Sequence, residues 1–245
     1  MPADALVLRT VDFGESDRIV HLLMPREGRL TAIAKGARRS QRRFPGVLDV
    51  FNRLRIEVAA RRRPGSLARL EQARLVECFP GLRVRPGRFA LACYLVELLD
   101  RLAPEGAEGG RLFGFAIQAL ALVERSSPDQ RLRVLLDLRA LDAVGLRPRL
   151  DRCVRCGGEP AGFHVAEGGP LCRACGLRTA GLLPVQRGTL RALEQGLRLD
   201  LERLGRLALS GAALAEAREL VRRFQRFHVG LEMRSESFLD HVLPG

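Results

Sequence analysis

Four cysteines are the residues of this chain whose type and spacing point most directly to chemistry. Cys153, Cys156, Cys172 and Cys175 form the pattern C-x2-C-x15-C-x2-C. Two short C-x2-C turns can each present a pair of thiolates to one point, and four thiolates suit a tetrahedral zinc ion. A glycine follows each pair and gives the backbone the freedom that such a tight turn needs. The spacing therefore predicts one bound Zn²⁺.

A zinc ion held by four cysteines indicates a structural role rather than a catalytic one. Catalytic zinc keeps one position open for water, and four thiolates leave none. His164 lies between the two pairs and could replace a ligand, but we expect a partly exposed loop histidine because the shell is already filled. We therefore expect a clip that stiffens one segment of a larger domain. The alternatives are zinc loops that contact a ligand directly, or two disulfides in a secreted protein.

The chain carries a strong positive charge that is unevenly distributed. Its 245 residues have a formal net charge of +13 and a sequence pI near 11.1. Lys35 is the only lysine among 41 basic residues, an arginine bias that genome composition can also produce. Residues 26–63, however, hold twelve basic and three acidic residues. A phosphate-binding face accounts for this concentration better than composition does, so we expect a polyanionic partner.

The elements that must position these residues begin as strands. Five apolar runs bounded by turn residues predict strands over 5–11, 18–24, 28–35, 48–58 and 67–79. The fourth run alternates between apolar and polar residues with the period of two that a half-buried strand requires. Five strands without an intervening helix indicate a small closed barrel. We favour an OB-fold, and an SH3-like barrel is the alternative.

Further along the chain, apolar residues repeat at helical spacing. We expect helices over 89–102, 112–124, 127–145, 187–197 and 210–231. Ser127 should begin the third helix with a capping box, and Ser210 should cap the last helix, which should bury Phe224 and Phe227. The sequence thus predicts an α+β multidomain chain. A five-stranded OB-fold nucleic-acid-binding domain over 1–80 precedes an all-helical domain over 81–245, which carries the inserted four-cysteine zinc site at about 151–177.

The candidate nucleic-acid-binding residues fall in two places. The basic segment over 35–43 follows the third strand, where a loop of an OB-fold borders the nucleic-acid groove. It is not a P-loop, because no Gly-Lys-Ser/Thr follows a glycine at the required distance. The outer face of the fourth strand adds an aromatic residue among arginines, which could stack a base or pack against the helical domain. The candidates are Lys35, Arg38, Arg39, Arg42, Arg43, Phe51, Arg53 and Arg55.

Other function classes are disfavoured. The four histidines are scattered, and no dinucleotide loop or metal-hydrolase histidine pair occurs, so we expect no enzymatic activity. Charges interrupt every apolar stretch, and the first residues lack the order of a signal peptide. We therefore expect a cytosolic protein without a membrane partner. Tryptophan is absent and Tyr94 is the only tyrosine, so phosphate electrostatics should dominate binding.

Three stretches near the start of the chain carry a family resemblance. They are ALVLR at 5–9, FGESDRIV at 13–20 and GRLTAIAKGARRS at 28–40. Together they resemble the start of the bacterial RecO family of DNA repair and recombination mediators. The barrel, the helical domain and the inserted four-cysteine site also come in that family's order along the whole chain.

The resemblance implies a function in DNA repair and homologous recombination by the RecF pathway. It implies an OB-fold with a structural zinc, binding of single- and double-stranded DNA, and annealing of complementary strands. It further implies work with RecR, often with RecF, to load RecA onto strands coated by single-stranded DNA-binding protein, in the bacterial cytoplasm at the nucleoid. Within the basic segment the family pattern matches at Lys35, Arg38 and Arg39, whereas Arg42 and Arg43 are added on charge alone.

Two other classes of function fit the same residues. One is a zinc-ribbon protein that binds RNA or acts in transcription. The other is a docking scaffold whose basic surface receives an acidic peptide, such as the tail of the single-stranded DNA-binding protein. Arg222, Arg223 and Arg226 would be the candidates for that contact.

Overall fold

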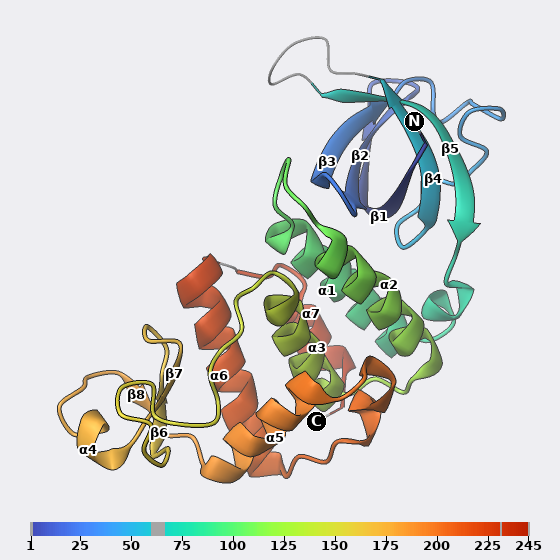
Figure 1. The fold of residues 1–245 in the computed structure, drawn as a ribbon. Coiled ribbons are helices and arrows are strands. Elements are labelled where there is room, and N and C mark those ends of the chain that lie inside the picture. Colours follow the sequence, from blue (N-terminus) through green and yellow to red (C-terminus); the bar gives the residue numbers. More distant parts are fainter. Residues whose placement is uncertain (1, 60–66, 231, 245) are drawn as a thin grey trace. The chain divides into compact units, whose positions relative to one another are not determined.

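The computed structural model describes residues 2–59, 67–230 and 232–244. It divides into two compact units, Met1–Arg125 and Ser126–Gly245 (Figure 1), and each is described by itself. Helices α1 (Pro86–Leu102) and α2 (Gly110–Arg125) belong to the same unit as the strands. Residue 80 therefore marks the change from strands to helices, and its use as a domain boundary stays a prediction.

Five strands of the first unit close into a barrel, as expected. They are β1 (Ala3–Phe13), β2 (Asp17–Met24), β3 (Gly28–Ala34), β4 (Arg53–Ala59) and β5 (Ala68–Glu77). Their order around the barrel is β1-β2-β3-β5-β4, and β1 closes it by pairing with β4. The β3–β5 pair is parallel, whereas the other pairs are antiparallel. This is the OB-fold order, so the OB-fold prediction is confirmed over the SH3-like alternative.

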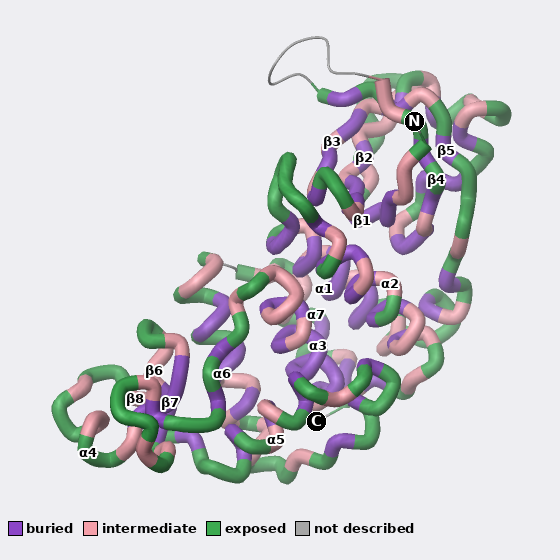
Figure 2. The backbone as a smooth tube through the Cα atoms, in the orientation of Figure 1, coloured by how far each residue is buried: buried purple, intermediate pink, exposed green. Residues whose placement is uncertain are grey.

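The barrel interior is filled by alternate residues of each strand. In β4, Leu54 and Ile56 are buried while Arg55 and Glu57 are exposed, which confirms the predicted period of two. The strand begins at Arg53, however, because the preceding residues belong to a long connection from β3. Phe44 and Leu48 of that connection, each 1 % exposed, belong to the same core. In Figure 2, buried and less buried stretches alternate along the strands of the barrel.

The two helices cover one end of the outer barrel face. His21 of β2 places Nδ1 3.3 Å from Asp100 Oδ1 of α1, and Arg29 of β3 forms an ion pair of 2.6 Å with Glu105. Gly28 begins β3 with a φ of +64°, and a Cβ there would lie 2.1 Å from the carbonyl oxygen of Pro104. Only glycine fits this approach, which fixes the β2–β3 turn against the chain that follows α1.

The second unit is helical around a small three-stranded sheet. Its elements are α3 (Gln130–Ala143), β6 (Gly162–His164), β7 (Gly169–Leu171), α4 (Arg173–Gly176), β8 (Leu182–Leu183), α5 (Arg187–Arg198), α6 (Gly211–Val229) and α7 (Glu236–Val242). A 3₁₀ turn over Leu201–Arg206 also belongs to this unit, whereas the 3₁₀ turn over Pro80–Arg83 belongs to the first. The helical domain with an inserted four-cysteine segment is thereby confirmed.

Helix ends and faces agree with the sequence only in part. Ser210 caps α6, because its Oγ accepts a hydrogen bond of 3.2 Å from the Ala213 N–H, as predicted. The cap of α3 is Asp129 rather than Ser127, since the Asp129 carboxylate accepts the Leu132 N–H at 2.8 Å. The expected burial of Phe227 is wrong: it is 61 % exposed, because it lies outside the face of α6 that packs on its neighbours.

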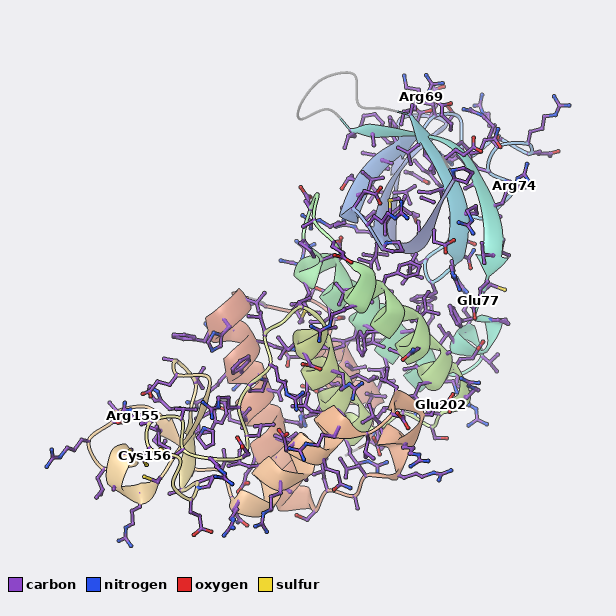
Figure 3. All side chains as sticks on the ribbon, viewed as in Figure 1. Arg69, Arg74, Glu77, Arg155, Cys156 and Glu202 are labelled. Carbon is purple, nitrogen blue, oxygen red and sulfur yellow. The ribbon has the colours of Figure 1, made fainter. Side chains whose placement is uncertain are left out.

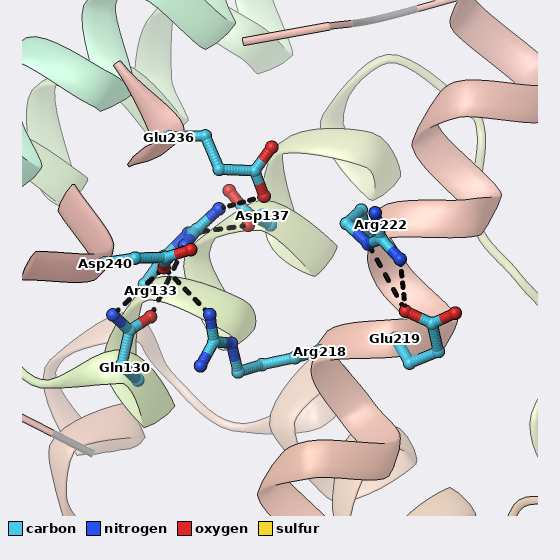
Figure 4. Close-up of polar contacts among 8 residues, drawn as sticks. All are labelled: Gln130, Arg133, Asp137, Arg218, Glu219, Arg222, Glu236 and Asp240. Carbon is cyan, nitrogen blue, oxygen red and sulfur yellow. Dashed lines mark hydrogen bonds and ion pairs between the residues drawn. The ribbon is translucent and has the colours of Figure 1, made fainter. Parts of the chain in front are cut away.

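A buried arginine holds three elements of the second unit together (Figure 4). The guanidinium of Arg133 in α3 donates hydrogen bonds to Glu236 at 2.7 Å and to Asp240 at 2.6 Å, both on α7. Asp137, one turn along α3, lies 3.8 Å from the same group. Arg218 of α6 reaches Asp240 at 2.8 Å. Each buried charge thus faces opposite charge, which is the condition for burying it.

Candidate metal centre and nucleic-acid interface

The four cysteines meet at one point, as their spacing predicts. Among the described residues, the sulfur atoms of Cys153, Cys156, Cys172 and Cys175 form a cluster in which all lie within 4.8 Å of one another. Cys156 Sγ lies 3.5 Å from Cys172 Sγ and 3.7 Å from Cys175 Sγ. A tetrahedral zinc with bonds of about 2.3 Å needs sulfurs about 3.8 Å apart, so the cluster fits this ion.

Two matching turns create the cluster. The Gly157 N–H donates to the Cys153 carbonyl, and the Gly176 N–H donates to the Cys172 carbonyl, both at 2.8 Å. Gly158 follows the first turn so closely that a Cβ there would lie 3.3 Å from Cys156 Sγ. The glycine after the first pair therefore allows the close approach to sulfur that the sequence indicated, whereas a Cβ on Gly176 would meet Leu182 at 2.8 Å.

The local backbone favours ionised sulfur at one ligand, whereas crowding opposes it at another. Burial raises the pKa of Cys153, but hydrogen bonds from the backbones of Cys172, Cys156 and Arg155 outweigh it and lower this pKa to about 6. Hydrogen bonds with neighbouring thiols, Cys172 first, raise the pKa of Cys175 to about 12. The thiols compete for one small space, and a divalent cation is the group that would let all four ionise together.

Arg155 binds the two halves of the cysteine segment together. It lies between Cys153 and Cys156, and Figure 3 shows it beside Cys156. Its guanidinium donates to both carboxylate oxygens of Glu167, at 2.5 and 2.9 Å, and to Thr179 Oγ1 at 3.1 Å. The hydrogen bond from Arg155 lowers the pKa of the Glu167 carboxyl. The bidentate contact with Glu167 fixes the first cysteine turn against the chain before the second turn, and the contact with Thr179 fixes it against the chain after the second turn.

His164 has another partner. His164 lies on strand β6, and its Nδ1 lies 3.1 Å from a carboxylate oxygen of Glu167. Within the part of the chain that the structure describes, the metal cluster contains the four cysteines and not this histidine. This placement agrees with the expectation that His164 is not a ligand. The residue is half-buried on a strand, however, and not partly exposed in a loop as expected.

The basic segment, residues 35–43, lies against the turn between β1 and β2. The Gly36 N–H donates a hydrogen bond of 2.7 Å to Asp17 Oδ1, and the Arg38 N–H donates one of 3.0 Å to the Ser16 carbonyl. The Arg38 guanidinium also reaches the Glu15 carbonyl at 3.3 Å. An OB-fold binds oligonucleotides with the β2–β3 face and the β1–β2 and β4–β5 connections, so the segment borders that face.

The cations of the basic segment differ in how far they are engaged. Lys35, Arg39 and Arg42 are exposed, and none has a hydrogen-bond or ion-pair partner for its side chain among the described residues. Arg38 lies 3.7 Å from Asp12. Arg43 donates to the Lys35 carbonyl at 2.6 Å and so closes the segment on itself. Three cations therefore remain available to phosphates, and two also shape the loop.

The arginines of β4 are not gathered with the basic segment. Arg53 pairs with Asp4 at 3.2 Å and with Glu77 at 3.5 Å, and Arg55 pairs with Asp4 at 3.4 Å. Strand β4 lies between β5 and β1 in the barrel, whereas the basic segment leaves β3. The eight candidates therefore do not form one surface. The Arg-Arg-Arg-Pro-Gly stretch over 61–65 separates the fourth and fifth predicted strands, where the sequence predicts a turn. It holds three further arginines and lies outside the described residues.

Phe51 is not exposed, which corrects the expectation that it could stack a base. Its side chain is 1 % exposed and lies in a turn before β4, with a φ of +77°. The ring packs edge-on against Phe89 of α1 with centroids 6.0 Å apart, and the Arg83 guanidinium lies 5.2 Å from its centre. The alternative of packing against the helices is confirmed.

The structure shows an exposed aromatic that sequence reasoning missed. Phe13 ends β1, is 52 % exposed, and lies directly before the turn that supports the basic segment. The sequence does contain a signal for this position, because Phe13 alternates with Val11 and directly precedes the Gly14-Glu15-Ser16 turn. The exposure of Phe13, however, depends on β1 extending past the part of the barrel that the helices cover, and the sequence alone does not indicate this.

Comparison with known proteins identifies the family of this chain. The family model described as Recombination protein O N terminal matches residues 1–79, and that described as Recombination protein O C terminal matches residues 83–237. The chain belongs to the RecO family. Among its relatives, the DNA repair protein RecO of Anaeromyxobacter dehalogenans is 40% identical over 249 residues, covering 98% of this chain and 95% of the relative.

Further relatives agree with this assignment. The DNA repair protein RecO of Myxococcus xanthus is 37% identical over 98% of this chain and 96% of its own length, and that of Syntrophus aciditrophicus is 32% identical over 98% and 95%. The family resemblance read from the sequence is confirmed, and the chain is a RecO-family DNA repair protein. No helix in the described residues is both long and apolar enough to cross a membrane.

Proposed function

We propose that this RecO-family protein binds single- and double-stranded DNA through the basic segment beside the β1–β2 turn. The observation that carries the proposal is that Lys35, Arg39 and Arg42 are exposed and have no partner among the described residues, on a segment held by Asp17 and Ser16. Cations without protein partners are free to replace the counterions of a phosphate backbone.

The proposed activity is annealing of complementary strands without covalent chemistry. Two DNA strands repel each other through their phosphates, and arginines that neutralise both strands lower that repulsion so that bases can pair. The cysteine cluster would hold one structural Zn²⁺, which stiffens the inserted segment and leaves no open position for catalysis. The protein therefore acts as a mediator and not as an enzyme.

The proposed partners follow the family resemblance. They are RecR, often with RecF, and single-stranded DNA-binding protein. With RecR, the protein would help to load RecA onto strands coated by single-stranded DNA-binding protein, in the cytoplasm at the nucleoid. Arg222 and Arg223 both donate to Glu219, and Arg226 lies 3.4 Å from Glu232. Because each of these arginines already has an acidic neighbour, the docking of an acidic tail at this point is less favoured than DNA binding at the basic segment.

A salt titration of DNA binding tests the proposal. Fluorescence anisotropy of a labelled single strand would be measured for the wild type and for an Arg39→Ala/Arg42→Ala variant. Each phosphate contact on a single strand contributes about 0.7 to the slope of log K against log[salt], so the variant should lose about 1.4 of slope. Neither side chain has a hydrogen-bond or ion-pair partner in the part of the chain that the structure describes, so the folded state should be unaffected.

A charge-matched control separates the two groups of arginines. Arg55 and Arg74 lie opposite each other on β4 and β5 and are both exposed. An Arg55→Ala/Arg74→Ala variant changes the net charge equally and should leave the slope near the wild-type value. A loss of slope in this control, with none in the Arg39/Arg42 variant, would place DNA on β4 and β5 and contradict the proposal.

A further inference from the structure

An apolar row crosses the outer face of the barrel at the end that the helices leave uncovered. Val11 pairs with Ile19 on β2, and Ile19 pairs with Ile33 on β3. Their neighbours Val20 and Ala32 point into the core, so these three side chains point outward. Val11 is 39 % exposed, and Ile19 and Ile33 are half-buried.

Phe13 extends this row toward the β1–β2 turn. It follows Val11 by two residues on β1 and therefore lies on the same face. Its register partner is Asp17, the residue that also accepts the Gly36 N–H. An aromatic ring that is 52 % exposed contributes little to the barrel core, and the core cluster includes Phe44 and Leu48 but not Phe13. The ring is thus available to a partner.

Cationic side chains border the apolar row where it approaches the basic segment. Arg69 of β5 is the register partner of Ile33, so the row ends in a guanidinium that is 45 % exposed and pairs with Glu71 at 2.9 Å (Figure 3). Lys35 follows β3 directly, and the Arg38 guanidinium reaches the β1–β2 turn. An apolar and aromatic strip bordered by positive charge is complementary to a chain with flat apolar bases and negative phosphates.

We propose that this strip, formed by Val11, Phe13, Ile19 and Ile33, stacks the unpaired bases of a DNA strand, with Phe13 as the main stacking ring. The inference rests on the proposed DNA binding and adds a contact that lets the protein distinguish single-stranded from double-stranded DNA. In a duplex the faces of the bases are covered by their neighbours, so only phosphates are presented. In a single strand the bases can leave the stack and pack on a protein ring.

The matched pair of substitutions is Phe13→Ala and Phe227→Ala. Both remove an exposed phenylalanine, at 52 % and 61 % exposure, but Phe227 lies on α6 in the other compact unit. Phe13→Ala should weaken binding of an oligo-dT strand by about 5- to 150-fold and leave duplex affinity unchanged. The salt slope should stay at the wild-type value because the phosphate contacts remain. Phe227→Ala should change neither affinity.

A spectroscopic readout reports contact directly. The chain has no tryptophan, and its one tyrosine, Tyr94, is 1 % exposed, so a Phe13→Trp variant has a single dominant fluorophore. Oligo-dT should quench its emission on binding. An abasic strand with the same number of phosphates should bind with the same salt slope and cause little quenching.

The outcomes separate the two proposals. If wild type and Phe13→Ala bind oligo-dT equally and the Phe13→Trp emission does not respond, the stacking inference is wrong while phosphate binding stands. Equal losses on oligo-dT, duplex and the abasic strand would also overturn it, because they indicate a structural role for Phe13. If the wild type binds no DNA at all, the proposed function fails and the stacking inference fails with it.

Discussion

The carboxylate of Asp17 accepts a hydrogen bond of 2.7 Å from the backbone N–H of Gly36, and this contact joins the first turn of the barrel to the basic segment. Asp17 begins β2 and lies opposite Phe13 in the hairpin. Gly36 has a φ of +67°, a conformation that glycine adopts without strain. One acidic side chain thus holds the basic segment beside the hairpin end that carries the exposed ring.

The Asp17 contact predicts a difference between two substitutions. Asp17→Asn keeps an oxygen that accepts the Gly36 N–H, whereas Asp17→Ala removes the acceptor, and both remove the same negative charge. Relative to Asp17→Asn, Asp17→Ala should weaken single-strand binding by about two- to tenfold, because the basic segment loses its tether. Anisotropy titrations of the two variants at one salt concentration measure this. Equal affinities would show that the hydrogen bond does not position the cations.

The cysteine cluster predicts that one zinc ion stabilises the second unit. A Cys175→Ser variant should lose bound zinc and melt at a lower temperature than the wild type, because one ligand of a closed tetrahedral site is missing. Metal analysis of the purified protein and thermal unfolding provide the two readouts. Cys78→Ser is the control, since Cys78 is exposed and outside the cluster. Wild-type protein that binds no zinc after supplementation would contradict the assignment.

Arg155 is expected to act on the metal through its neighbours. Arg155→Ala removes both hydrogen bonds to Glu167 and the one to Thr179, so zinc affinity should fall by about 10- to 100-fold. Competition with a chromogenic chelator measures this without any DNA assay. Arg152→Ala is the matched control, because Arg152 is an exposed arginine beside the same turn. The two variants should differ; the same affinity in both would argue against positioning by Arg155.

The buried ion cluster of the second unit predicts an asymmetric cost. Arg133→Met leaves Asp137, Glu236 and Asp240 without their shared cation and should lower the free energy of unfolding by about 3–5 kcal/mol. Arg218→Ala removes only a partly exposed partner of Asp240 and should cost less than about 1 kcal/mol. Chemical denaturation compares the two. A similar small loss in both variants would mean that Arg133 is not the centre of the cluster.

Short-range patterns predicted much of this fold and its metal centre. The two C-x2-C turns fix sulfur positions through contacts within a few residues, so their spacing was sufficient for Cys153, Cys156, Cys172 and Cys175. The five strands were likewise detectable from apolar runs between turns. These features depend on local geometry, which a sequence states directly.

The side chains that sequence analysis misplaced depend on distant neighbours. Periodicity assigned Phe51 to an outward face, but the residue lies in a turn and meets Phe89, 38 positions later in the chain. Arg53 appeared free because its partner Asp4 precedes it by 49 positions. Phe13 is exposed only because α1 covers a different part of the barrel. Which face is covered is decided by tertiary packing, and no local pattern carries that information.

In the proposed function, the basic segment binds DNA phosphates. The most direct test is a salt titration of single-stranded and duplex oligonucleotides against the wild type and a Lys35→Glu/Arg38→Glu/Arg39→Glu variant. We expect the wild type to bind both DNAs with a steep salt dependence, and the variant to lose most of that affinity and slope. Unchanged affinity and slope in a folded variant would contradict it.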